Sequence, residues 1–348
     1  MRIAMALQGA RVTTDTLRSR PVGGTEAAFA VLAEAFARRG HTVEALMGEE
    51  PPERQAGIDW RPIGAGTGAP ADLVIASRVP HLFAALPPPR GRGSRRVLWL
   101  FNPCRYLRKP RYLWPILRLR PIAVTLGRYH DGTLPRWMPF AGRAQLPLPV
   151  APPFDAAPAG AVQPPPPPVA VFASNPLRGL DWLLDLWERR ILPAVPGAEL
   201  HCYTGAATYG GDPRLAARAA PVMARAGALS SAGVRLLPPT DRFALARAYR
   251  GARAMLYPGD PNETYCLSLA EAQSAGLPCI VTDSGSVAER VVDGETGLVA
   301  RDAAAFAEAA IRLLTDDAAW SSMHHAALAR GPAPDGDAVA AGFEALLR

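Results

Sequence analysis

The chain has 348 residues, of which 49% are hydrophobic and 20% are charged, and its formal net charge is +7. This length suits about two domains that each bury a core, and the composition excludes an intrinsically disordered chain. No stretch reaches the ~18 apolar residues of a membrane-spanning helix. The N-terminus, MRIAMALQGA, is typical of a first strand rather than a signal peptide, so we expect a cytoplasmic protein.

Arginine carries almost all of the basic charge, since Lys109 is the sole lysine. A genome rich in arginine, alanine and proline codons produces such an excess without any function. It therefore indicates an anionic partner only where it is locally concentrated. The cysteines lie far apart with no C-x-x-C pair, which predicts buried thiols rather than a disulfide framework or a zinc site. They are Cys104, Cys202, Cys266 and Cys279.

Strands and helices alternate in the N-terminal half, which predicts an α/β domain over residues 1–150. The clearest helix covers 24–39, where Phe29, Leu32, Ala33 and Phe36 recur at helical spacing and Gly40 provides a C-terminal cap. The predicted strands are 2–7, 42–46, 72–76, 96–101 and 122–126.

Residues 151–168, APPFDAAPAGAVQPPPPP, form a proline-rich linker, because a proline run cannot continue a helix or an interior strand. The alternation resumes beyond it and predicts a second α/β domain over 169–330. Residues 331–348 form a second break, GPAPDGD, and a last helix over 338–347. In the second domain, strands are predicted at 169–173, 199–203, 234–237, 254–257 and 279–282.

The most informative stretch is NETYCLSLAEAQSAG, residues 262–276, which follows a strand and begins a helix near 264–268. The start of this helix favours an anion. Glu263 is expected in the loop just before the helix, and Glu271 is expected about two turns inside the helix. Carboxylates there would repel a phosphate, but each can accept sugar hydroxyls, at roughly 1.5 to 3 kcal/mol. A ligand with a sugar, a diphosphate and a ribose in a row fits all three positions.

This Glu-x7-Glu spacing, with the downstream SGSVAERVVDGETGLVA, resembles the retaining nucleotide-sugar glycosyltransferases of the GT-B fold (glycosyl transferases group 1, family 4-like). PVGGTEAAFAVLAEAFARRGHTV resembles the glycine-rich first loop and helix of the same family. The resemblance implies two Rossmann-like domains whose parallel sheets face an interdomain cleft, with the C-terminal helix as a candidate to cross back to the N-terminal domain. It also implies that Glu263 holds the transferred sugar and Glu271 the ribose.

Further donor contacts follow from the resemblance. Gly23 and Gly24 would let the backbone approach a diphosphate closely. Arg178 matches the second of two family cations that neutralise the leaving diphosphate, while Ser174 or Asn175 stands near the first. Along the helix start, the expected donor-binding residues are Thr264, Tyr265, Cys266, Leu267 and Ser268, with Asn175 beside Arg178.

A family histidine that touches the donor sugar is replaced here by Phe101 and Asn102. His130 is a possible substitute, so Asn102 and His130 are candidate sugar or acceptor contacts. A lone histidine near a strand end is more typical of an ordinary surface position. Asp335 and Asp337 formally spell the Asp-x-Asp metal motif of a different glycosyltransferase fold, but their proline-rich surroundings favour a turn.

The resemblance predicts an enzyme, a hexosyltransferase that moves a sugar from a UDP- or GDP-sugar to an acceptor such as a precursor in polysaccharide biosynthesis. We expect no cofactor and no metal, because no other carboxylate or histidine cluster has ligand spacing and Arg178 with the helix start can meet the leaving charge. Two alternatives stay open: a catalytically silent nucleotide-sugar-binding or scaffold protein, and a GT-B-fold sugar epimerase. A phosphorylase is disfavoured because only Lys109 could bind pyridoxal phosphate.

Between Asp72 and Asp131 the sequence has no acidic residue and twelve basic ones. Within it, CRYLRKPRYLWPILRLRP mixes arginine with aromatic and aliphatic residues, a pattern typical of surfaces that meet anionic lipid headgroups. Pro110 and Pro115 predict a short, broken element there. We expect peripheral attachment to the inner membrane leaflet and a lipid-linked or otherwise anionic acceptor. A solvated basic face is the main alternative, and nucleic-acid binding lacks a recognisable fold.

Overall fold

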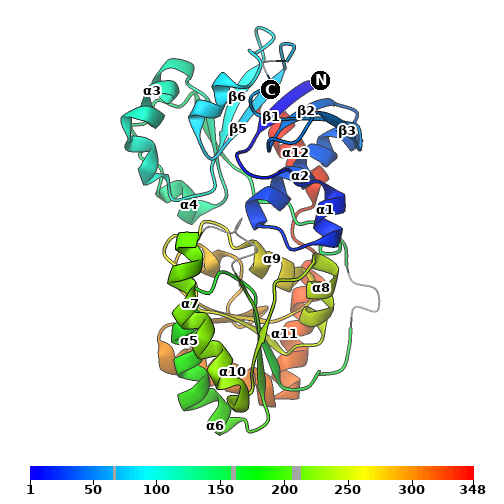
Figure 1. Cartoon of the computed structure of the whole chain (residues 1–348). Helices are drawn as coiled ribbons and strands as arrows, with labels where there is room; N and C mark the ends of the chain where they lie inside the picture. The colour runs from blue at the N-terminus through cyan, green and yellow to red at the C-terminus, as the bar shows by residue number, and fades with distance from the viewer. Residues whose placement is uncertain (66–67, 158–161, 206–212) are drawn as a thin grey trace. The chain divides into compact units, whose positions relative to one another are not determined.

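A computed structural model describes residues 1–65, 68–157, 162–205 and 213–348. The chain divides into two compact units (Figure 1). The first contains Met1–Thr16, Gly24–Ala151 and Pro334–Arg348, and the second contains Leu17–Gly23 and Pro152–Ala333. Residues 158–161 of the predicted linker lie outside the described residues. Both units are built on mainly parallel sheets, as the fold prediction required.

The first unit has an eight-stranded sheet in the order β3-β4-β2-β1-β5-β6-β7-β8. Neighbours pair in parallel, except β3 with β4. The central strands are continuous apolar runs with both faces buried, the pattern that parallel sheets covered by helices require. Its strands are β1 (Arg2–Ala6), β2 (Thr42–Leu46), β3 (Glu53–Gln55), β4 (Ile58–Arg61), β5 (Leu73–Ser77), β6 (Arg95–Trp99), β7 (Ile122–Thr125) and β8 (Gly142–Gln145).

In the first unit, the long helix follows the predicted spacing of apolar residues. The longest, α2, buries the apolar residues that recur at helical spacing. The proline-containing segment folds as a 3₁₀ turn, η2 (Cys104–Arg108), and a separate helix that begins at Pro110, so the expected break occurs there, whereas Pro115 lies inside that helix without ending it. The helices are α1 (Thr14–Ser19), α2 (Gly24–Arg38), α3 (Pro110–Leu119), α4 (Arg128–Gly132) and α12 (Gly336–Ala345).

The second unit has a six-stranded parallel sheet in the order β11-β10-β9-β12-β13-β14. Chain order reverses between β9 and β12, and ligands of such doubly wound sheets bind outside the carboxyl ends at that reversal. The strands are β9 (Val169–Phe172), β10 (Glu199–Tyr203), β11 (Val234–Leu237), β12 (Ala254–Tyr257), β13 (Cys279–Thr282) and β14 (Gly297–Ala300). The helices are α5 (Leu180–Leu186), α6 (Leu192–Ala194), α7 (Pro213–Ala228), α8 (Arg242–Arg250), α9 (Leu267–Ser274), α10 (Ala303–Thr315) and α11 (Asp317–Arg330).

Every helix within the described residues is too short or too polar to cross a bilayer.

The C-terminal helix α12 packs on α2 in the first unit, as the family resemblance implied. It begins at Gly336, two residues earlier than predicted, because the Asp335 carboxylate caps it by accepting the Ala338 N–H at 2.8 Å. A Cβ at Gly336 would lie 2.9 Å from Ala35 Cβ, so glycine allows the two helices to approach closely. Asp335 is therefore a helix cap rather than a turn residue.

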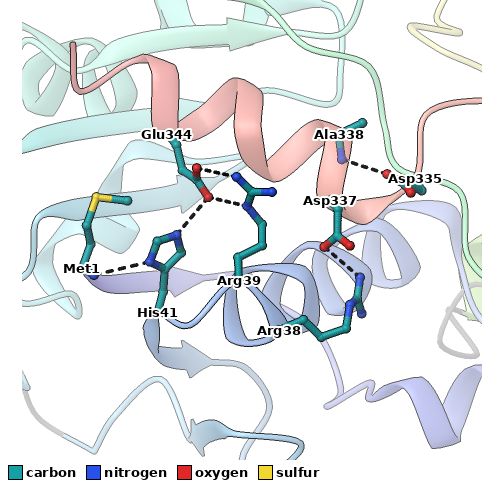
Figure 2. A network of polar contacts seen from close by, with 8 residues as sticks. All are labelled: Met1, Arg38, Arg39, His41, Asp335, Asp337, Ala338 and Glu344. Atoms are coloured by element: carbon teal, nitrogen blue, oxygen red, sulfur yellow. Dashed lines mark hydrogen bonds and ion pairs between the residues drawn. The ribbon is translucent and has the colours of Figure 1, made fainter.

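A polar network fixes the other end of α12 (Figure 2). The Arg39 guanidinium donates two hydrogen bonds to Glu344, of 2.6 and 2.7 Å, and His41 Nε2 lies 2.9 Å from the same carboxylate. Hydrogen bonding from Arg39 is the main cause that lowers the pKa of Glu344 to about 2. Asp337 pairs with Arg38 nearer the helix start, at 3.2 Å, where both side chains are exposed.

We predict that Glu344→Gln loosens α12. A half-buried, bidentate carboxylate is expected to contribute about 1 kcal/mol here after solvent screening, so amide exchange in 336–345 should speed up about 5-fold at pH 7. The folded pKa lies below the ordinary unfolded value of about 4.3, so this contribution is present above about pH 5 and is lost as the pH falls toward 2. Hydrogen exchange measured by mass spectrometry tests the first part, and urea midpoints at pH 7 and pH 3 test the second.

The matched control is Asp337→Asn, which breaks an exposed pair on the same helix and should change stability by no more than about 0.3 kcal/mol. Equal effects of the two substitutions would show that the Arg39 network does not hold the helix.

Candidate functional site

Two loops of the second unit meet where its strand order reverses. One follows β9 and contains Asn175 and Arg178, and the other follows β12 and contains Glu263. Asn175 Oδ1 accepts the Leu177 N–H at 2.9 Å, which turns the first loop into α5. Gly179 has φ +86°, and a Cβ there would lie 2.8 Å from Pro258 Cβ. Glycine therefore allows the two loops to touch.

Glu263 is buried and pairs with Arg178, so the structure brings the two predicted catalytic residues together. Tyr257 Oη donates to Glu263 Oε2 at 3.1 Å, and the Cys266 N–H donates to Oε1 at 3.2 Å. Burial raises the pKa of the Tyr257 phenol far above its ordinary value, so this hydroxyl remains a donor at neutral pH. The side chain of Glu263 is 9% exposed and that of Arg178 is 37% exposed. Of the pair, the arginine is therefore the more accessible to a ligand.

The loop that carries Glu263 is fixed by its own backbone and by the glycine of the SGS motif. The Glu263 N–H donates to Asp260 O at 2.8 Å, and the Ser286 N–H donates to Glu263 O at 3.0 Å. Gly285 has φ +69°, and a Cβ there would overlap Asp260 O and lie 2.9 Å from Glu263 O. The glycine downstream of the helix thus sets the position of the first glutamate.

Helix α9 begins later than predicted. Cys266 adopts a left-handed conformation, φ +61°, at the N-cap, and the helix starts at Leu267. The delay follows from the Cys266 N–H, which bonds the Glu263 carboxylate rather than entering the helix. Glu271 therefore lies little more than one turn inside the helix. The prediction that it lies about two turns inside is wrong.

Most of the predicted donor-binding side chains at this helix start are buried. Thr264, Tyr265, Cys266 and Leu267 are buried, and Ser268 is half-buried. The Arg290 guanidinium covers the Tyr265 ring at 4.4 Å from its centroid. What this segment can present to an anion is chiefly the backbone N–H groups of the first helical turn, which have no partners inside the helix.

Glu271 also has an arginine partner. Arg242 Nε donates to Glu271 Oε1 at 2.9 Å, and the two side chains are 7% and 5% exposed. Arg242 is the first residue of α8, whose start is capped by Asp241 through the N–H groups of Phe243 and Ala244, both at 2.9 Å. Burial raises the pKa of the Glu271 carboxyl, and the charge of Arg242 opposes that rise. Arg242 and Tyr257 cannot be recognised as site residues from the sequence, because neither has a motif spacing that marks it.

The candidate residues of the first unit have a different character. Gly24 is half-buried and begins α2, and the half-buried Gly23 before it is the last residue of the segment that belongs to the second unit. His130 is fully buried, so its interpretation as a surface residue is wrong. Its Nδ1 accepts the Leu126 N–H at 3.2 Å and its Nε2 lies 2.9 Å from Asn102 O, which identifies the neutral tautomer with the proton on Nε2. The structure thus brings Asn102 and His130 together through a backbone carbonyl, while the Asn102 side chain is exposed. This geometry favours a structural role for the histidine.

Phe101, at the place of the expected family histidine, is buried and packs against Trp99, with 4.6 Å between ring centroids and the rings tilted by 51°. Within the described residues, no group of three or more histidine, cysteine, aspartate or glutamate side chains could hold a metal ion. The four cysteines are free and buried, in agreement with the expectation of buried thiols.

Known proteins resemble this chain in part of its sequence and in its fold. Residues 167–316 match the family described as "Glycosyl transferases group 1". A curated relative, the D-inositol 3-phosphate glycosyltransferase of Frankia alni, is 37% identical over 83 residues, which are 23% of this chain and 20% of that protein. The chain therefore matches only about a fifth of the length of this relative.

Solved structures match over nearly the whole chain at low identity. A sucrose-phosphate synthase from Thermosynechococcus elongatus has a TM-score of 0.73 at 17% identity, covering 99% of this chain and 98% of its own. A trehalose-6-phosphate protein from E. coli, bound with UDP-2-fluoro glucose, has a TM-score of 0.67 at 13% identity, covering 100% and 99%. Residues 167–316 are thus similar to the glycosyl transferases group 1 family, and the chain has the GT-B fold of these solved structures.

Proposed function

We propose that the chain transfers a hexose from a UDP- or GDP-sugar to an acceptor and retains the anomeric configuration. The observation that carries the proposal is the pair of buried glutamates on either side of the α9 start, each held by an arginine. Glu263 then holds the transferred sugar, Glu271 the ribose, and the helix start with Arg178 the diphosphate between them. The sugar nucleotide of a solved neighbour, UDP-2-fluoro glucose, supports this class of donor.

The reaction in this proposal takes place on one face of the sugar. The bond between the anomeric carbon and the diphosphate oxygen breaks, and a bond from the anomeric carbon to an acceptor hydroxyl oxygen forms on the same face. The departing phosphate oxygen takes the hydroxyl proton, so the reaction needs no side-chain nucleophile. The protein contributes positioning and a preorganised positive field at the leaving oxygen.

Two other functions remain possible for the same site. A silent nucleotide-sugar-binding or scaffold protein is motivated by Phe101 at the place of the family histidine and by Ser174 or Asn175 at the place of the first family cation. A sugar epimerase of the GT-B fold would also use a nucleotide sugar. Incubation with a panel of UDP- and GDP-sugars separates the three, since only the transferase joins the sugar to an acceptor and only the epimerase changes the sugar without transfer.

The two glutamates are predicted to have separable effects. Glu271→Ala should weaken UDP or GDP binding by ~1.5 to 3 kcal/mol, because two hydroxyl contacts to the ribose are lost. Glu263→Ala should leave binding of the free nucleotide within about 2-fold and lower turnover, because its partner is the sugar. Calorimetry with the nucleotide and initial rates with the nucleotide sugar measure the two effects. If Glu271→Ala binds the nucleotide as the wild type does, the ribose assignment is wrong.

Arg178 is proposed to supply charge in place of a metal. Arg178→Ala should lower kcat by ~10²-fold or more, the usual cost of losing one preorganised charge at a developing anion. EDTA should leave wild-type turnover nearly unchanged. Inhibition by EDTA that Mn²⁺ or Mg²⁺ reverses would overturn the metal-independent reaction, and an unchanged kcat in Arg178→Ala would remove the arginine from it.

We further propose that the first unit binds the acceptor and attaches to anionic membrane. Helix α3 is anchored to the core by the fully buried Ile116, while Trp114 is 70% exposed and Leu117 is 47% exposed. Exposed basic residues flank these apolar side chains. They are Arg105, Arg108, Lys109, Arg111, Arg118 and Arg120. Apolar side chains among cations are the combination that anionic headgroups attract, with each cation worth ~1 kcal/mol near the surface. The acceptor is then lipid-linked or otherwise anionic.

Co-sedimentation with liposomes tests the membrane proposal. Binding should rise with the fraction of anionic lipid and fall with salt, and replacing Arg108, Lys109 and Arg111 with serine should weaken it by ~10-fold or more. The matched control is the triple serine variant of Arg189, Arg190 and Arg218, which removes the same charge from exposed positions of the second unit. Equal binding to neutral and anionic liposomes would leave a soluble acceptor as the remaining possibility.

A further inference from the structure

The ion pair between Arg242 and Glu271 is more deeply buried than the pair at Glu263. Its two side chains are 7% and 5% exposed, whereas Arg178 is 37% exposed. Taking two charges out of water costs several kcal/mol per ion, and apolar residues of the same volume often stabilise a fold at least as well. The burial of this pair therefore points to a role other than stability.

The proposed donor explains why a charged pair is useful at this place. A ribose diol is best held by a carboxylate that accepts two hydrogen bonds, and a protonated carboxyl accepts them more weakly. A buried carboxylate without a partner would take up a proton, and it would also repel the diphosphate. Arg242 counters both effects, because its guanidinium remains charged and bonds one oxygen of Glu271.

We infer that Arg242 is a positioning residue that keeps Glu271 ionised and fixed for the ribose of the donor, an inference that rests on the proposed function. Arg242 acts through Glu271 and need not touch the donor. Its place at the capped start of α8 holds the guanidinium against α9. The residue lies outside the Glu-x7-Glu pattern and comes from a different helix.

Helix α8 supplies two groups that face Glu271. Arg242 is one, and the other is Tyr249, whose phenol has its pKa raised far above the ordinary value by burial and then by the Glu271 charge. Tyr249 in turn faces Cys266 and Cys279, and burial raises the pKa of both thiols, that of Cys279 to about 12. Helix α11 also packs on α9 and carries His324, whose Nδ1 lies 2.7 Å from Gly276 O, beyond the C-terminal end of α9. The phenol and the thiols therefore stay neutral at neutral pH, and Glu271 is the group of the α8 contact whose ionisation Arg242 controls.

The first test measures UDP and GDP binding by calorimetry between pH 5.5 and 8.5. Arg242→Gln should bind about 10-fold more weakly than the wild type at pH 6 and should recover as the pH rises and Glu271 ionises. Arg242→Lys keeps the positive charge but lacks the planar fork of the guanidinium. Compared with Arg242→Gln, it should therefore remove most of the pH dependence of nucleotide binding but recover only part of the wild-type affinity. Adding Glu271→Gln to Arg242→Gln should abolish the pH dependence. Arg253→Gln is the matched control: this mostly buried arginine of the same unit pairs with Asp317 at 2.7 Å and should leave affinity unchanged.

The second test needs no nucleotide and measures urea unfolding over the same pH range. A carboxyl whose folded pKa is raised holds a proton that the unfolded chain, with its pKa near ~4.3, releases. Stability then falls as the pH rises. Arg242→Gln should therefore lose stability with rising pH more steeply than the wild type, while its nucleotide affinity increases. The double variant with Glu271→Gln should lose this extra slope.

The outcomes distinguish the inference from the proposed function. If the wild type binds neither nucleotide, the donor site is wrong, and the unfolding slopes still decide whether Arg242 keeps Glu271 ionised. If the wild type binds but Arg242→Gln shows a pH-independent loss, or the double variant keeps the same slope, Arg242 is only a structural residue and the inference is overturned.

Discussion

Under the proposed function, the candidate site depends on one constraint: two carboxylates must remain buried beside the carboxyl ends of the strands without repelling a diphosphate. The structure meets it by giving each glutamate an arginine from another segment, Arg178 from the loop after β9 and Arg242 from α8. Both pairs are close to neutral, so the field at the start of α9 remains available to an anion. The reversal of strand order between β9 and β12 brings the loops of the first pair to the same edge.

The two pairs differ in what they leave accessible. Arg242 is enclosed with its partner, whereas Arg178 is more than one third exposed while it bonds Glu263. The family's first cation has no charged counterpart here, since Asn175 shapes the loop turn and the Ser174 hydroxyl lies 3.4 Å from Tyr257 Oη. Tyr257 and the Cys266 N–H also bond Glu263, so its carboxylate would keep two donors if Arg178 bonded a diphosphate. In the proposed reaction, Arg178 can therefore be shared between the glutamate and the leaving group.

The sequence was sufficient for the α/β fold, because apolar periodicity is a local property, while the roles of the two glutamates stay predictions from their spacing. It did not reveal β3, β4, β8 or β14, which are short and lie at or near the sheet edges with partly exposed residues. It also placed the start of α9 too early, because the bond from the Cys266 N–H to Glu263 is visible only in three dimensions. Arg242 and the buried His130 were missed or misjudged for the same reason: their partners lie 29 and 28 residues away.

The arginines of this chain differ in burial, and their expected roles differ accordingly. At Arg242 a guanidinium is enclosed, and arginine suits that place because it keeps its charge where a lysine would more readily lose its proton. At Arg178 it is half-open and can pass from a carboxylate to a phosphate, to which its planar fork is matched. On α3 the arginines are exposed beside Trp114, where their charge is screened by salt and acts only on a nearby surface. The net charge of +7 therefore does not indicate what any single arginine does, because the surroundings of each arginine determine its chemistry.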